Sequence, residues 1–492
     1  MVDLKRPRPV ATYALAITLA LFATACDSND PDPVPTPPGI NGNVLQVEGG
    51  RGTVVDISLT LNAEAGIQSL TLSVDGGASQ TLSVNVGATQ QAFTHSFEIP
   101  ASSVLGTIFT LLFTLTDQDG ATSMTTAMVT TGKVIETPDT YTFERNGQSS
   151  VFYGGQNDRL DMVEEMKAVL RDGDRGEIIS EQVLLDMFEN TGNNGGGNFS
   201  FTSDRQLKNK VFAPDLDDRL FEDLFARAAA ASVVGNGGGK AANGTAGLIE
   251  RENSGSTILV DENGREFTQF IEKGLMGSVM YNQIFNLYLT DERTGDNVEN
   301  TALADGKNYT NMEHGWDEAF GYWNPPLDFT SPWPSERGNE DRFWSHYSNV
   351  VDNVNNGQLG TNAILMTAYR EGRAAIVNND LATKNAQRDI LYEYLELVAA
   401  ATAVHYINDT LGALDEGKTG EAFHVLSEAW AFTNALRYSP RRTLSLADIE
   451  QIMETDFGAN GNFWNVTPAG LNAAKATLVT AYPKLAPVQD DL

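Results

Sequence analysis

The sequence predicts a multidomain protein, with an N-terminal all-β sandwich followed by a large all-α helical-bundle domain. From about residue 44 to 131, short runs alternate apolar and polar residues and are rich in Val, Thr, Leu and Ser. After Pro138, apolar residues recur every three or four positions, as in LFEDLFARAAAA. The first periodicity is typical of half-buried strands and the second of amphipathic helices.

The first 25 residues read as a signal peptide. Lys5, Arg6 and Arg8 precede an apolar run from Val10 to Ala25 that ends in small residues, which is the order of such segments. The run is too short for a stable membrane span. We therefore expect an exported protein.

Cys26 is the only cysteine in the chain and follows this run directly. The arrangement resembles a bacterial lipobox, although Ala23 stands where Leu is usual. The resemblance implies lipidation of Cys26 and an anchor in the outer membrane or at the cell surface; a plain secretory signal with an incidental cysteine is the alternative. Residues 26–42, rich in Pro and Asp, are expected to form a flexible tether. A single cysteine allows no disulfide within the chain.

The chain is strongly acidic. It carries 33 Lys and Arg against 65 Asp and Glu, a net charge of −32, and removing residues 1–25 makes this −34. Such a charge repels phosphate backbones, so nucleic acid is not an expected partner. Cations are the natural partners, and a solvated acidic surface that serves solubility is the alternative.

Residues 43–133 form the predicted sandwich domain. Turn signals such as Asp75-Gly76-Gly77 and Asp117-Gln118-Asp119-Gly120 separate its strands at intervals of about ten residues. The segment resembles bacterial immunoglobulin-like and cadherin-like modules. The resemblance implies a spacer.

Residues 139–492 form the predicted helical domain, which is long enough to bury a large core. The pattern predicts helices over Arg159–Arg171, Ser180–Glu189, Leu216–Val234, Phe267–Leu289, Asn311–Tyr322, Asn362–Val377, Ala386–Asn408, Gly420–Arg437 and Leu446–Glu454. Standard zinc-protease, serine-hydrolase and phosphate-loop motifs (HExxH, GxSxG, GxxxxGK[ST]) do not occur in it.

Two of these helices carry a histidine four residues before a glutamate. The pairs are His314 with Glu318 and His424 with Glu428. This spacing places both side chains on one helix face, so two such helices facing each other would supply four metal ligands. We therefore expect a divalent metal, iron or zinc, at these four residues. Second-rank candidates are Asp317, Glu421, His405 and Asp409.

Two alternatives to a metal site remain open. The pairs could be surface salt bridges worth a few tenths of a kcal/mol, or parts of a buried structural network. The segment TAYREGRAAI, with Arg370, Glu371 and Arg373, predicts such a charged network, with the acids of the site as its partners.

The aromatic residues leave a further alternative. All six tryptophans follow residue 315, and four lie between Trp316 and Trp344. Large aromatics can line a sugar-binding cleft, so a SusD-like glycan-binding lipoprotein is one rival; a packed lid on the core is the other reading of this cluster. A hydrolase that uses His314 or His424 as a base is a weaker rival, because the sequence identifies no nucleophile.

Four segments together resemble an uncharacterised bacterial lipoprotein family, domain of unknown function 4856. They are YTFERNGQSSVFYGGQNDRLDMVEEMK, MEHGWDEAFGYW, REGRAAI and HVLSEAWAF. That family is similar in outline to the imelysins, iron-regulated helical envelope proteins with a GxHxxE motif. Here the glycine two before His314 is absent, and Asp317 replaces the motif's Glu. The resemblance implies iron uptake together with an outer-membrane uptake partner. We expect a binding protein, not an enzyme.

Overall fold

The computed structural model describes residues 36–42, 45–212, 214–338 and 340–492. The predicted signal peptide, Cys26 and most of the predicted tether lie outside the described residues. In the part of the chain that is described, no helix is both long and apolar enough to cross a membrane.

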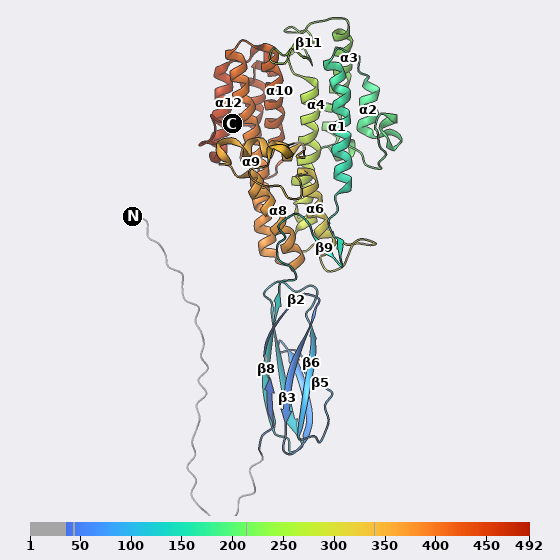
Figure 1. The fold of residues 1–492 in the computed structure, drawn as a ribbon, viewed down its shortest axis with the longest axis vertical. Helices are drawn as coiled ribbons and strands as arrows, with labels where there is room; N and C mark the ends of the chain where they lie inside the picture. Colours follow the sequence, from blue (N-terminus) through green and yellow to red (C-terminus); the bar gives the residue numbers. More distant parts are fainter. Residues whose placement is uncertain (1–35, 43–44, 213, 339) are drawn as a thin grey trace, which may run out of the picture. The chain divides into compact units, whose positions relative to one another are not determined.

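The first region, residues 39–132, is rich in strands (Figure 1). Its strands are β1 (Gly39–Gly42), β2 (Gln46–Gly50), β3 (Val54–Asn62), β4 (Ile67–Val74), β5 (Gln80–Leu82), β6 (Gln90–Glu98), β7 (Ile108–Asp117) and β8 (Thr122–Gly132). They form one sheet in the order β1-β3-β6 and a second in the order β2-β8-β7-β4-β5. The pairings β1–β3, β4–β5 and β4–β7 are antiparallel, and β2 pairs with β8 in parallel.

Alternating side chains explain why these segments form strands. Along β7, Leu111, Phe113 and Leu115 are completely buried, whereas the residues between them are partly exposed. A period of two places these residues on one face of the sheet. The same alternation was visible in the sequence.

The second region, residues 139–492, is mainly helical. Its α-helices are α1 (Gly154–Asp174), α2 (Glu181–Glu189), α3 (Pro214–Asn236), α4 (Phe267–Leu275), α5 (Asp291–Thr294), α6 (Asn311–Trp323), α7 (Trp344–Asp352), α8 (Thr361–Asn378), α9 (Leu381–Asp415), α10 (Thr419–Ala435), α11 (Leu446–Gln451) and α12 (Pro468–Ala481). The region also has two short antiparallel hairpins: β9 (Glu144–Arg145) with β10 (Gln148–Ser149) before α1, and β11 (Gly247–Glu250) with β12 (Thr257–Val260) between α3 and α4. The prediction of a strand-rich region followed by a helical one is confirmed.

Each of the nine predicted helices has a counterpart. The predicted helix 267–289 is α4 followed by two π-helical segments, η4 (Met276–Tyr281) and η5 (Ile284–Tyr288). Helices α5, α7 and α12 were not predicted. Helix α9 is longer than predicted, because Asp380 caps its first turn by accepting a hydrogen bond from the Thr383 backbone.

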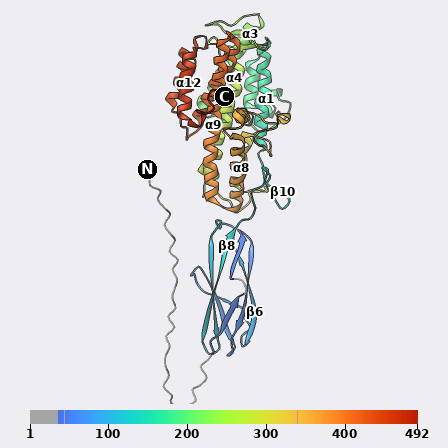
Figure 2. The same cartoon turned by 60° about the vertical axis from the view of Figure 1, so that its left-hand side comes forward.

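The helices pack around one continuous apolar core that runs from Tyr141 to Leu492. Helix α9 lies beside α10 and α12, while α4 lies beside α1 and α10 (Figure 1). Helices α8 and α9 run side by side (Figure 2). All nine residues of α4 are buried, including Glu272 and Lys273. A helix buried on every side normally carries no charge, so these two residues need partners.

Candidate functional site

Helix α6 carries the first predicted pair and begins with a capping box. The Thr310 hydroxyl accepts a hydrogen bond from the Glu313 backbone at 3.2 Å, and a carboxylate oxygen of Glu313 accepts one from the Thr310 backbone at 2.8 Å. These contacts satisfy backbone donors that the first turn leaves without partners. The sequence T-N-M-E therefore fixes where the helix begins, and with it the direction in which His314 points.

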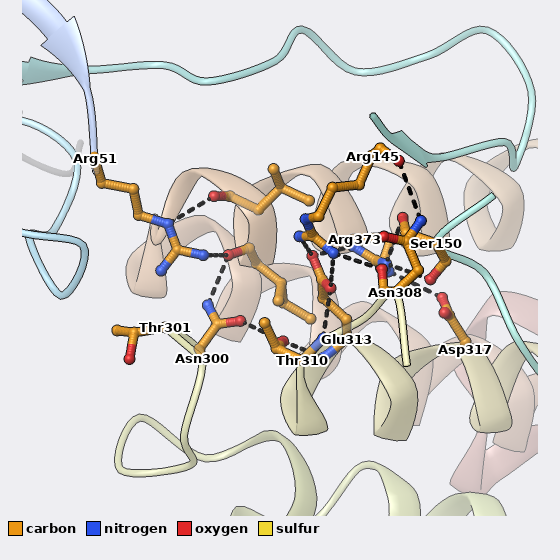
Figure 3. A network of polar contacts seen from close by, with 12 residues as sticks. Arg51, Arg145, Ser150, Asn300, Thr301, Asn308, Thr310, Glu313, Asp317 and Arg373 are labelled. Atoms are coloured by element: carbon orange, nitrogen blue, oxygen red, sulfur yellow. Dashed lines mark hydrogen bonds and ion pairs between the residues drawn. The ribbon is translucent and has the colours of Figure 1, made fainter. Parts of the chain in front are cut away.

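One face of α6 lies against a buried network of charged groups (Figure 3). Arg145 binds Glu313 through two hydrogen bonds of 2.8 and 3.1 Å. Arg373 of α8 lies 3.0 Å from the same carboxylate and donates to Asp317 at 2.9 Å. Glu313, Asp317 and Arg373 are all completely buried. Two guanidinium groups thus balance two carboxylates, so this network joins α6 to α8 and leaves no charge for a ligand.

The pKa values reflect this balance. Burial favours the neutral acid, but Arg373 and Arg145 still hold the pKa of Glu313 below its usual value. Burial raises the pKa of Asp317 to about 6, against the effects of Arg373 and of the hydrogen bond from Tyr141. The predicted charged network is confirmed for Arg373, and its partners are acids of α6. Asp317, a second-rank candidate for metal binding, is already fully engaged.

The network also fixes the surroundings of His314. The Phe152 backbone N–H donates to Asp317 at 3.3 Å, and the Phe152 carbonyl lies 3.1 Å from His314 Nδ1. A carbonyl can only accept, so Nδ1 carries the proton and Nε2 keeps its lone pair. Burial lowers the pKa of His314 although Glu318 opposes this, so the ring is neutral at neutral pH. The ring also stacks on Tyr309, with 4.5 Å between centroids.

The free nitrogen of His314 lies 3.6 Å from Glu318 Oε2. The other carboxylate oxygen, Glu318 Oε1, accepts a hydrogen bond of 2.9 Å from Gln156, whose amide also contacts the Tyr288 hydroxyl. Both members of the pair line a recess of about 460 Å³ beside α6, here named the α6 recess. The residues that line it are Asp291, Glu292, Arg293, Asn297, Val298, Glu299, Asn311, His314, Gly315 and Glu318.

The composition of the α6 recess suits a cation. Four carboxylates, two amides and one imidazole line it, against one guanidinium. Gly315 packs closely there, because a Cβ at this position would lie 3.2 Å from both the backbone oxygen and the Cβ of Arg293. The described lining residues include no hydroxyl or thiol, so the recess itself offers a hydrolase no nucleophile.

The second predicted pair lies on α10 in different surroundings. His424 Nδ1 donates to Glu266 at 2.6 Å, and Nε2 lies 3.5 Å from Glu428 Oε1. Burial favours the neutral ring, but Glu266 and Glu428 raise the pKa of His424 overall. The two carboxylates thus favour an imidazolium at this position, and each ring nitrogen faces a carboxylate. A protonated imidazole has no lone pair for a metal.

The remaining candidates lie apart from these two pairs or serve other contacts. His405 Nε2 lies 3.6 Å from Asp409 on α9. Glu421 binds Arg251 through hydrogen bonds of 2.6 and 3.2 Å. The structure brings together each predicted pair but not the pairs with one another. Among the described residues, no group of three or more His, Cys, Asp or Glu side chains is arranged to hold a metal ion.

The tryptophan cluster packs inside the protein. Trp316, Trp323 and Trp344 are completely buried, and Trp333 is 5% exposed. Trp316 lies so close to α8 that a Cβ at Gly372 would lie 2.0 Å from its ring, and its indole N–H donates to the Tyr369 carbonyl at 2.9 Å. These four rings offer no exposed face for a sugar.

The helical region matches a known protein family. The family model described as "Domain of unknown function (DUF4856)" matches residues 138–482. The chain belongs to this family. The matched segment begins where the strand-rich region ends and contains both histidine pairs. No curated protein matches the chain.

Sequence reasoning missed Glu266, the closest partner of His424, and the buried pair Glu272 and Lys273. Glu266 precedes α4 and is 158 positions from His424, so no helical spacing relates them. A signal for the second pair was present. Glu272 and Lys273 are the only charged residues in the mainly apolar helical segment FTQFIEKGLMGSVMY, and charges in such a segment indicate a buried polar group.

Proposed function

We propose that the protein is a ligand-binding lipoprotein of the bacterial cell envelope, and that its helical region binds a divalent cation in the α6 recess. The observation that carries this proposal is the state of His314. Its Nδ1–H donates to the Phe152 carbonyl, while its Nε2 faces Glu318 within an acidic recess. A hydrogen bond from the second ring nitrogen to a carbonyl is how metal-binding imidazoles are usually oriented.

The donor set indicates what kind of cation fits. One imidazole and one carboxylate come from the protein at close range, so the ion keeps part of its water shell. Zinc and ferrous iron accept this combination of ligands. Asp291, Glu292 and Glu299 add negative charge around the recess. The His424 pair is not part of this proposal, because both ring nitrogens already face carboxylates, which raise the pKa of His424.

The envelope location rests on the N-terminal segment. The basic residues, the apolar run and Cys26 support lipidation of Cys26 after removal of residues 1–25. Mass spectrometry of the mature N-terminus tests this; an unmodified N-terminus at or beyond Asp27 would contradict it. The two sheets of residues 39–132 and the parallel β2–β8 pairing support an immunoglobulin-like sandwich that acts as a spacer.

The cation is tested by calorimetric titration of the purified full chain with Zn²⁺ and, without oxygen, with Fe²⁺. His314→Ala should weaken binding of the cation by at least about 10-fold. A loss of this size is already typical when only a hydrogen-bond partner of a metal ligand is removed. Because the pKa of His314 is lowered, binding should persist at pH 6.5 and decline only at lower pH.

His405→Ala is the matched control. His405 also lies 3.6 Å from an acid four residues later and is similarly exposed, but it does not line the α6 recess. This variant should bind the cation as the unchanged protein does. Equal affinities for all three proteins, or no binding by the unchanged protein, would refute the proposal.

A further inference from the structure

A second recess, here named the α1 recess, lies between α1, α4 and the start of α7. Its volume is about 720 Å³, within the range of small-molecule sites. The residues that line it are Glu164, Lys167, Ala168, Arg171, Arg175, Glu272, Lys273, Gly338, Asp341, Arg342, Phe343, His346 and Tyr347. It shares no lining residue with the α6 recess.

The charge of the α1 recess is opposite to that of the chain. Five Lys and Arg side chains and one histidine line it, against three carboxylates. The whole chain has about twice as many acids as bases. A local excess of bases in such a chain concentrates positive potential at one place.

Two lysines, a partly exposed one and a buried one, share one carboxylate in this recess. Lys167 Nζ lies 2.7 Å from Glu272 Oε1, and Lys273 Nζ lies 2.9 Å from Glu272 Oε2. Lys273 is 5% exposed and Glu272 is 4% exposed. Glu428 also attracts Lys273, but that carboxylate interacts with His424 and accepts a hydrogen bond from Tyr347 as well. Lys167 and Lys273 therefore bring more positive charge to the recess than Glu272 neutralises.

Helix α1 adds a row of like charges. Lys167, Arg171 and Arg175 are spaced four residues apart. They therefore lie on the same side of α1, toward its C-terminal end, where Arg175 is the residue that caps the helix. Like charges at this spacing destabilise a helix. Within the described residues, Arg171 makes no ion pair. Burial lowers the pKa of Lys167, and the charges of Lys273 and Arg171 lower it further. An anion bound between these side chains would remove the repulsion.

We propose that the α1 recess binds a small polyanion, a molecule with two or more phosphate or carboxylate groups, whose oxygens contact Lys167, Arg171 and Lys273. Arginine and lysine side chains bind such groups through charge-assisted hydrogen bonds. Asp341 adds a contact of a different kind. Its Oδ2 accepts from Asn349 at 3.0 Å, whereas its buried Oδ1 has no partner among the described residues, so a hydroxyl on the ligand could donate to it.

The experiment is a calorimetric titration of the purified full chain with pyrophosphate and, separately, with citrate, at low ionic strength. Arg171→Gln is the informative variant because the described structure gives this side chain no ion pair to lose, so its unfolding temperature should not change. Its affinity for the bound anion should fall roughly 10-fold or more. High salt should weaken binding to the unchanged protein.

Arg437→Gln is the control, since it removes the same charge from a residue that pairs with Glu450 and does not line the α1 recess. It should bind as tightly as the unchanged protein. Binding of only pyrophosphate or only citrate supports the site and identifies the group it prefers. The proposal is wrong if neither anion binds, or if Arg171→Gln and Arg437→Gln bind equally well. His314→Ala should leave anion binding unchanged, so this test is independent of the cation proposal.

Discussion

The two histidine–glutamate pairs have the same spacing on their helices but lie in different electrostatic surroundings. On α6, a backbone carbonyl binds the Nδ1–H of His314, and the ring stays neutral. On α10, the carboxylate of Glu266 binds His424 at 2.6 Å and raises the pKa of the ring, which favours the protonated form. His314 thus keeps an unprotonated Nε2, while His424 links α10 to the segment before α4. The group that contacts the histidine from outside its helix therefore sets the charge of the ring, whereas the i, i+4 spacing within the helix does not.

The largest expected effect concerns the pair on α10. Glu266→Gln removes the closest partner of a nearly buried imidazolium, and loss of one member of a buried ion pair typically costs about 3–5 kcal/mol of unfolding free energy. Chemical denaturation at pH 6 should show a loss of this size. A loss below about 1 kcal/mol would mean that His424 is neutral and that the two pairs are alike.

The same variant should change how stability depends on pH. In the unchanged protein the pKa of His424 is raised, so its stabilisation is complete below about pH 6.5 and is lost as the pH rises through the folded-state pKa. Glu266→Gln should remove most of this dependence. Comparison of the denaturation curves at pH 6 and pH 9 measures it.

The second prediction concerns Asp174, a buried acid near Glu266. Burial and the charge of Glu266 raise the pKa of Asp174 to about 7. A raised pKa means that the protonated acid is favoured in the folded state, so this residue costs stability as the pH rises from about 4 to about 7. Asp174→Asn should therefore stabilise the protein at pH 8, by at most about 4 kcal/mol, and change it little at pH 4.

The hydrogen bonds of Asp174 make asparagine a close substitute. The Leu259 N–H donates to Oδ1 at 2.9 Å, which the amide oxygen can still accept, and the Thr268 hydroxyl at Oδ2 can accept from the amide nitrogen. If the variant is less stable than the unchanged protein at pH 8, the prediction is wrong. The ionised carboxylate of Asp174 would then stabilise the fold through its attraction to His424.

The smallest expected effect concerns the pair on α6. Glu318→Gln should change the free energy of unfolding by less than about 1 kcal/mol, because the pair is partly exposed and His314 is uncharged. Glu318 raises the pKa of His314, so that pKa should fall in the variant. Proton NMR of the imidazole resonances, with His314→Gln to assign the signal, measures this shift. An unchanged pKa would show that Glu318 does not act on His314.

Much of the fold was predictable because local periodicity reports which faces are buried. The alternation along β7 and the three-to-four spacing in α1 follow from burial of one face of each element. Helix α7 was harder to predict. It begins at Trp344 directly after the turn at Phe343, whose φ is +48°, and it has nine residues. So short a helix depends on contacts with its neighbours more than on its own sequence.

The sequence by itself determined which residues form pairs within a helix, because neighbours four positions apart always share a face. In each of the three pairs, His314 with Glu318, His424 with Glu428 and His405 with Asp409, the histidine Nε2 lies within 3.6 Å of a carboxylate oxygen of its partner. It also determined the acidic charge and the change from strands to helices. Only the tertiary structure decided which distant group contacts each histidine: the Phe152 carbonyl for His314 and the Glu266 carboxylate for His424. It also decided that Lys167 and Lys273 bind the same carboxylate, Glu272. Those contacts set protonation and net charge, since inside a protein the energy of a charge depends on the groups packed around it and not on its neighbours in sequence.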